Sequence, residues 1–236
     1  MNLIQVTKTI GKLASFNMKI IFGGKFLWFM ITGFLLFCYL MFQTAWNGNI
    51  PNEATIYGQL FLPALLLIFY PAVFGIQNDA DHRVLEILFC IPNYKFKVWF
   101  FRLVMIYIEI YFILVVYAGT AYILLYPANP FEIAMQLMFP VLFMGNLAFF
   151  YSTLTRNGNA TAVLIIITSI ILLFMASAFF NNSMWNIFLN PFEVPTNIHP
   201  AIWAETLFNN RLFLIISSLV FIMLGLFNLQ KREKFL

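Results

Sequence analysis

Residues that could do chemistry are few in this chain, and most of them lie in one short stretch. Residues 78–92 hold two aspartates, a histidine, an arginine and a glutamate between two apolar runs. The only other histidine, His199, is separated from His82 by several apolar runs, so a zinc-type ligand group is not predicted. The sequence also lacks a His-Glu-x-x-His motif, a Gly-x-Ser-x motif and an aspartate deep in an apolar run. We therefore predict no catalytic and no metal-binding residues.

Glu109 is the one acidic residue deep inside an apolar run, in residues 98–125. It lies about 11 residues into that run, or roughly 16 Å along a helix. An ionisable group at that depth in a membrane is costly, which makes it a functional candidate by default. The alternative is a structural role, with Glu109 protonated or bonded to Tyr107 or Tyr111. Arg102 lies two turns earlier on the same face, within reach of a water-bridged contact.

Residues 78–92 are predicted to form a short amphipathic helix. Asn78 is of a type favoured as N-cap, and the two aspartates that follow suit the positive end of a helix dipole. Pro92 limits the far end. The two faces differ: Val84, Leu85, Leu88 and Ile91 are apolar, while Asp81, His82 and Glu86 are polar. Such a helix transmits force if a partner binds it; the alternative is a connector that only lies on lipid.

The elements that must position these residues are six apolar runs. The chain has 236 residues, of which 62% are hydrophobic and 9% charged, whereas a soluble domain has about 25% charged residues. About 20 apolar residues cross a ~30 Å hydrocarbon core. We therefore predict an all-α integral membrane protein, with residues 1–236 as one domain. The predicted spans are 26–43, 59–77, 98–125, 133–155, 161–180 and 212–229.

Basic residues fall in alternate gaps between these runs. Twelve of the thirteen Lys and Arg residues lie before the first run, around the gap between the second and third, in the gap between the fourth and fifth, or after the sixth. Arg211 is the exception. Because basic loop residues stay on the cytoplasmic side, both termini are predicted to be cytoplasmic, in the plasma (inner) membrane. The sequence pI of about 9.1 reflects this anchoring charge and gives no support for nucleic-acid binding.

Two flanking segments have their own patterns. Residues 1–25 are predicted to contain a basic amphipathic helix in the cytoplasmic interface. Residues 181–210 form an outer gap that stays apolar throughout, so we expect one or two short, partly re-entrant helices there; a disordered loop is the alternative. Cys38 and Cys90 do not form a disulfide framework.

Proline and glycine residues predict where the helices bend or end. Pro63 and Pro71 predict kinks or breaks in the second span. Pro127 and Pro130 predict a tight outer turn, and residues 156–159 predict a tight inner turn.

The stretch beginning at Asp79 resembles the signature of type-two ABC export permeases. That signature is acidic-x-acidic-x-Gly-Thr-Leu-Glu-x-Leu-x-x-x-Pro, then a basic residue three positions on and another seven later. Arg83 and Val84 stand in place of Gly-Thr. The layout is also similar, with an amphipathic N-terminal segment, six spans, a long apolar outer gap and a basic tail. The matching positions are Asp79, Asp81, Leu85, Glu86, Leu88, Pro92, Lys95 and Arg102.

The resemblance implies a permease subunit in which residues 78–92 are the coupling helix. It would dock in a groove of a separate ABC ATPase subunit, and a second permease, identical or related, would complete the translocation path. The chain has no phosphate loop, so ATP and Mg²⁺ would bind the ATPase and this chain would bind no cofactor. Glu109 and Asn146 are candidates for the path, Asn146 also being interpreted as a polar contact between helices. The expected ATPase contacts are Asp79, Asp81, His82, Val84, Leu85, Glu86, Leu88 and Pro92.

Three other hypotheses remain open at this point. A haem-exporter-like permease of cytochrome maturation has a similar acidic–Leu-Glu–Pro helix. A secondary transporter would use Glu109 as a proton carrier. A non-transporting scaffold would belong to a secretion or motility machine. No residue pattern indicates the substrate.

Overall fold

The fold is a bundle of long helices, seen in a computed structural model that describes residues 26–48, 50–81 and 95–229. In these residues every regular element is helical. Six helices are long and apolar enough to cross a membrane, which confirms the predicted all-α, multi-pass membrane fold. A π-helical segment, η1, leads directly into α5. The elements are α2 (Phe26–Trp46), α3 (Glu53–Asp81), η1 (Lys95–Phe100), α5 (Phe101–Leu124), α6 (Pro130–Thr155), α7 (Gly158–Ala178) and α8 (Pro200–Asn228).

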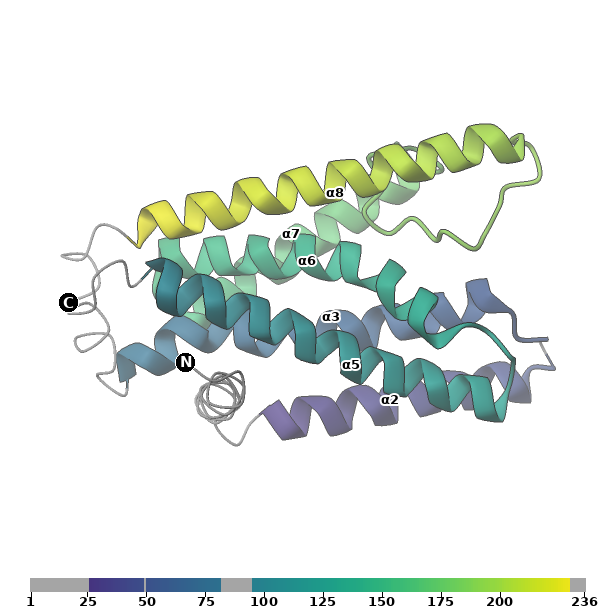
Figure 1. The fold of residues 1–236 in the computed structure, drawn as a ribbon, viewed down its shortest axis with the longest axis horizontal. Helices are drawn as coiled ribbons and strands as arrows, with labels where there is room; N and C mark the ends of the chain where they lie inside the picture. The colour runs from purple at the N-terminus through teal and green to yellow at the C-terminus, as the bar shows by residue number, and fades with distance from the viewer. Residues whose placement is uncertain (1–25, 49, 82–94, 230–236) are drawn as a thin grey trace, which may run out of the picture.

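The helices run back and forth along the long axis of the molecule (Figure 1). The end of α3, the start of η1, the α6–α7 turn and the end of α8 lie at one end, which we name the coupling end. The α2–α3 and α5–α6 turns and the long α7–α8 connection lie at the opposite end, which we name the loop end. Helix α6 is central, since it packs against α3, α5, α7 and α8.

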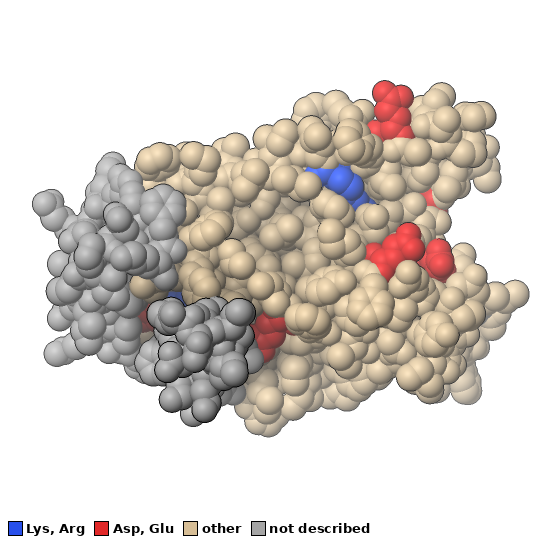
Figure 2. Space-filling model, viewed as in Figure 1, with Lys and Arg blue, Asp and Glu red and all other residues tan. Residues whose placement is uncertain are grey.

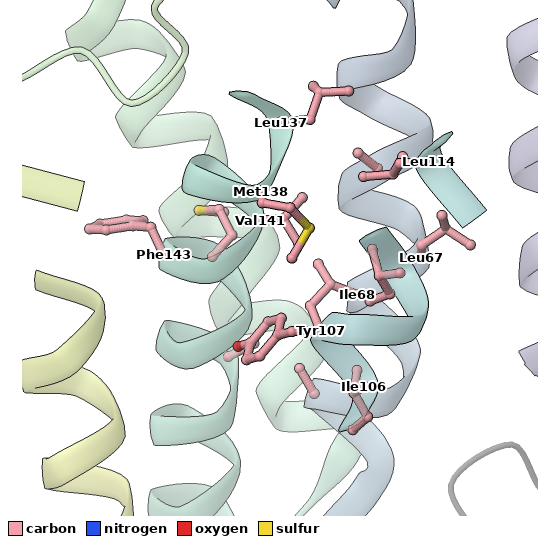
Figure 3. Packing of buried hydrophobic residues seen from close by; sticks show 14 of the residues in the cluster. Leu67, Ile68, Ile106, Tyr107, Leu114, Leu137, Met138, Val141 and Phe143 are labelled. Atoms are coloured by element: carbon pink, nitrogen blue, oxygen red, sulfur yellow. The ribbon is translucent and has the colours of Figure 1, made fainter. Parts of the chain in front are cut away.

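The core lies where α3, α5 and α6 meet (Figure 3). Side chains such as Leu67, Leu114 and Leu137 are fully buried there. Gly145 of α6 permits the close approach, because a Cβ at this position would lie 2.6 Å from Ile68 Cγ1. Without a hydrophobic driving force between helices in lipid, such close packing of small residues is a main source of association.

The tight turns follow the sequence prediction. Asn129 caps α6 by accepting a hydrogen bond from Phe131 N (3.1 Å), and Pro130 occupies the first helical turn, where its missing N–H costs nothing. Asn157 caps α7, and Arg156 before it adopts φ 56°. The prolines of α3 do not break it: the helix runs through both without interruption.

The long connection at the loop end differs from the prediction. Residues 200–210 are helical as the first turns of α8, but residues 181–199 form turns and bends in place of short helices. The physical reason is that Asn side chains satisfy the local backbone, as in Asn186, whose Oδ1 accepts from Phe188 N (2.9 Å). The segment still packs on the bundle, with Ile187 and Leu189 buried.

Several predictions fall on residues that the structure does not describe. These are the amphipathic helix within residues 1–25, the segment 82–94 and the basic tail in 230–236. They remain predictions.

Candidate functional site

A buried ion pair joins the two helix ends that flank residues 82–94. Arg102 Nη1 donates to Asp79 Oδ2 at 2.6 Å, and Nη2 donates to Oδ1 at 3.2 Å. Both residues are buried, at 3% exposure for Asp79 and 7% for Arg102. The two parallel bonds make a fork-on-carboxylate geometry that fixes orientation as well as distance. The pair therefore ties the last turn of α3 to the first turn of α5.

Trp99 of η1 reinforces this contact. The Arg102 guanidinium carbon lies 5.3 Å from the centroid of the Trp99 ring, a cation–π arrangement. The same ring lies 6.3 Å from the ring of Phe149 in α6. The ion pair is thus in contact with α6 through the Trp99 ring.

A second set of contacts joins α3 to the α6–α7 turn at the coupling end. The Gly158 N–H donates to Gln77 Oε1 at 2.5 Å, and Ser152 Oγ donates to the Val73 carbonyl at 3.1 Å. A Cβ at Gly158 would collide with the ring of Phe74, so the start of α7 lies directly against α3. Together with the ion pair, these contacts make the coupling end one connected unit.

The structure changes the interpretation of two residues of the predicted coupling helix. Asn78 is not a helix N-cap, because α3 continues through it to Asp81 and its Nδ2 donates to Tyr70 Oη (3.1 Å). Asp79 places its carboxylate in the buried pair with Arg102. The Asp81 side chain and the other expected contacts, His82, Val84, Leu85, Glu86, Leu88 and Pro92, lie outside the described residues.

Glu109 lies in α5 and faces a groove between α2 and α5. It is partly exposed and, within the described part of the chain, has neither a hydrogen bond nor an ion pair. Tyr107, which the sequence offered as a bonding partner for Glu109, does not bond to it, because the Tyr107 hydroxyl donates to Asn146 Oδ1 (2.7 Å). Arg102 is likewise occupied by Asp79. Figure 2 shows how few charged groups interrupt one face of the bundle.

Asn146 holds three helices together. Besides accepting from Tyr107 of α5, it donates through Nδ2 to Ser218 Oγ of α8 at 2.5 Å, and Ser218 Oγ donates to the Leu142 carbonyl at 3.2 Å. Asn146 is 3% exposed. Asn146 thus makes the polar contact between helices that was considered for it in the sequence analysis. The contact does not include Glu109, the other candidate for the translocation path.

Arg211 forms a polar cluster that sequence reasoning missed. Its Nε donates to Gln136 Oε1 at 2.9 Å, its Nη1 donates to Asn210 Oδ1 at 3.1 Å, and its guanidinium lies over the Phe139 ring. Arg211 Nη2 and the Tyr57 hydroxyl are both buried in this cluster, where they interact with each other electrostatically. The only sign in the sequence was that Arg211 alone departs from the alternation of basic residues.

The described residues contain no group of three or more His, Cys, Asp or Glu side chains that could hold a metal ion. His199 caps α8 through Nδ1, which accepts from Ala201 N at 3.3 Å. Comparisons with protein-family models, with curated proteins and with solved structures found no match. Any functional assignment therefore depends on the residues and their geometry.

Proposed function

We propose that the chain is the permease subunit of an ATP-driven ABC exporter. A second permease would form the translocation path with it, and separate ATPase subunits would bind at residues 82–94. The motif beginning at Asp79, the six-span layout and the lack of a phosphate loop in this chain support the proposal.

The observation that carries the proposal is the buried Asp79–Arg102 ion pair. A segment that transmits force must be attached stiffly to the helices it moves. The pair joins the last turn of α3, before residues 82–94 in the sequence, to the first turn of α5, after them. A push on the segment would then reach both helices together. An interfacial connector that only lies on lipid has no need of such a clamp.

The coupling end offers a path for that force into the bundle. The bonds from Gly158 to Gln77 and from Ser152 to Val73 connect α7 and α6 to α3. Because α6 contacts α3, α5, α7 and α8, a displacement of its end reaches most of the bundle. In this scheme Asp79 and Arg102 position the segment, and the residues beyond Asp81 make the contact with the ATPase.

The test is recovery of an ATPase with the tagged chain purified from its native membranes. Wild type should carry ATP hydrolysis activity and a subunit that is crosslinked by azido-ATP. Leu85→Asp should lose both while still inserting in the membrane, because a charge replaces an apolar anchor of the interface. Glu86→Ala should lose less of the ATPase, since charges at the rim of an interface contribute less to binding than buried apolar anchors do.

The matched control is Val194→Asp, the same kind of change at an exposed position of the loop end. It should retain the ATPase. If no ATPase accompanies wild type, or if Leu85→Asp retains it fully, the exporter proposal fails and a scaffold role is favoured.

A further inference from the structure

An open groove of about 670 Å³ lies on the side of the bundle between α2 and α5. Helix α2 packs on α3 and reaches α5 through Tyr117, whose hydroxyl donates to the Met30 carbonyl at 2.6 Å. The Tyr117 ring also lies 5.3 Å from the ring of Phe34. A space of this size falls in the range of pockets that take drug-sized ligands, about 300–1,000 Å³.

The groove is apolar except at one point. The Tyr117 hydroxyl bonds to the Met30 carbonyl. The Glu109 carboxylate is the one charged group on the wall of the groove. In the part of the chain that the structure describes, no side chain bonds to that carboxylate. The apolar wall includes Ile31, Phe34, Met105, Phe112, Ile113 and Val116.

A carboxylate facing such a wall sets the chemistry of the occupant. Coulomb attraction grows as the local dielectric constant falls, so a cation is attracted to this carboxylate more strongly than to one in water. The apolar wall in turn favours a ligand with a hydrophobic body. Glu109 and Tyr117 are eight residues apart on α5, or roughly 12 Å along the helix. A ligand with its charge at Glu109 can therefore extend its body toward Phe34 and Tyr117.

We propose that this groove binds an amphipathic organic amine. Its ammonium group pairs with Glu109, and its apolar body lies along Phe112 and Val116. As a binding site, the inference stands on the groove alone. As the substrate class of the exporter, it rests on the proposed function.

Other occupants fit the groove less well. A lipid acyl chain fills the apolar space but leaves the carboxylate without a partner. A second copy of the chain would have to bring a basic side chain to mid-span. Within the described spans the basic residues are Arg102 and Arg211, and both are buried in their own bundle.

The test is equilibrium binding by the full chain in phosphatidylcholine nanodiscs, with empty nanodiscs subtracted. The probe is a dansyl-labelled ten-carbon primary amine, compared with its N-acetylated form, which has a similar apolar body and no charge. Wild type should bind the amine at least about tenfold more tightly than the acetylated form. Glu109→Gln should remove that preference and leave binding of the acetylated form within about twofold.

Three further variants complete the design. Glu109→Asp keeps the charge and should keep the preference for the amine, even if it alters stability. Phe112→Ala should weaken both probes about threefold or more, because it removes shared apolar wall. Glu132→Gln, at the start of α6 and away from the groove, should bind both probes like wild type.

Two results would overturn the inference: equal binding of both probes by wild type, which indicates an apolar groove filled by lipid, or unchanged amine binding by Glu109→Gln. Binding by the purified chain needs no ATPase. Failure of the ATPase experiment would therefore leave the groove intact, and failure here would leave the exporter proposal intact.

Discussion

At the scale of the residue, the Asp79–Arg102 pair has the largest energetic effect that we expect from a single contact. Taking both charges out of water is costly, and the two direct bonds repay part of that cost. Removing one partner leaves the other buried and uncompensated. Removing both leaves only a packing change.

We predict that Asp79→Asn destabilises the purified chain by about 3 kcal/mol. The double variant Asp79→Leu with Arg102→Met should lie closer to wild type than Asp79→Asn does, because no buried charge is left unpaired. Unfolding in mixed micelles by increasing SDS measures both effects. Glu205→Gln, at an exposed acid of α8, serves as control and should change stability little. Wild-type stability in Asp79→Asn would contradict the buried pair.

At the scale of the element, α6 organises the bundle through close contacts that only a small residue permits. A Cβ at Gly145 would lie 2.6 Å from Ile68 Cγ1 and 2.7 Å from Tyr107 Oη, so α3 and α5 are both affected. The polar contact of Asn146 with Tyr107 and Ser218 lies one position further along. Packing and hydrogen bonding thus act at the same level of the helix.

We predict that Gly145→Ala destabilises the chain by about 1–3 kcal/mol, as overpacking does in a filled core. Gly119→Ala in α5 is the matched control, because nothing lies within 4 Å of a Cβ there. Since alanine favours helix over glycine, that control should be neutral or slightly stabilising. The same SDS unfolding measures both variants. Equal behaviour of the two would show that α6 does not pack so closely.

The α7–α8 connection is bonded to α8 by one buried side chain. Asn210 of α8 is fully buried and donates through Nδ2 to the Met184 and Asn186 carbonyls, both at 2.8 Å. These bonds hold a turn segment that has no helical hydrogen bonds of its own.

We predict that Asn210→Ala speeds amide exchange at residues 183–190 by about tenfold or more, because local opening then costs less free energy. Hydrogen–deuterium exchange with mass spectrometry measures this in detergent. Asn197→Ala, at an exposed position of the same segment, should leave the exchange unchanged. Uniformly fast exchange in wild type would mean that the segment is not packed on the bundle.

At the scale of the whole molecule, the alternation of basic residues predicts the orientation in the membrane. In a Cys38→Ser background, Ile50→Cys and Val194→Cys should react with an impermeant maleimide in intact cells. Both native side chains are exposed at the loop end. Cys90 should react only after the cells are permeabilised. Labelling of Cys90 from outside would reverse or refute the predicted topology.

The sequence by itself determined the class of protein and its six spans. Crossing a hydrocarbon core requires about 20 apolar residues whatever the neighbours are, so each span can be recognised alone. The turns at Pro127 and Pro130 and at residues 156–159 were equally local, since a turn depends on the few residues that form it. These features need no knowledge of how helices pack.

Only the tertiary structure decided which polar groups meet. Asp79 and Arg102 are 23 positions apart, and nothing in their spacing showed that they pair with each other. Helical periodicity defines the faces of a helix, but the face that meets a neighbour depends on the packing of all the helices together. For the same reason, only the packed bundle shows that Asn146 is satisfied by Tyr107 and Ser218 while Glu109 faces an apolar groove.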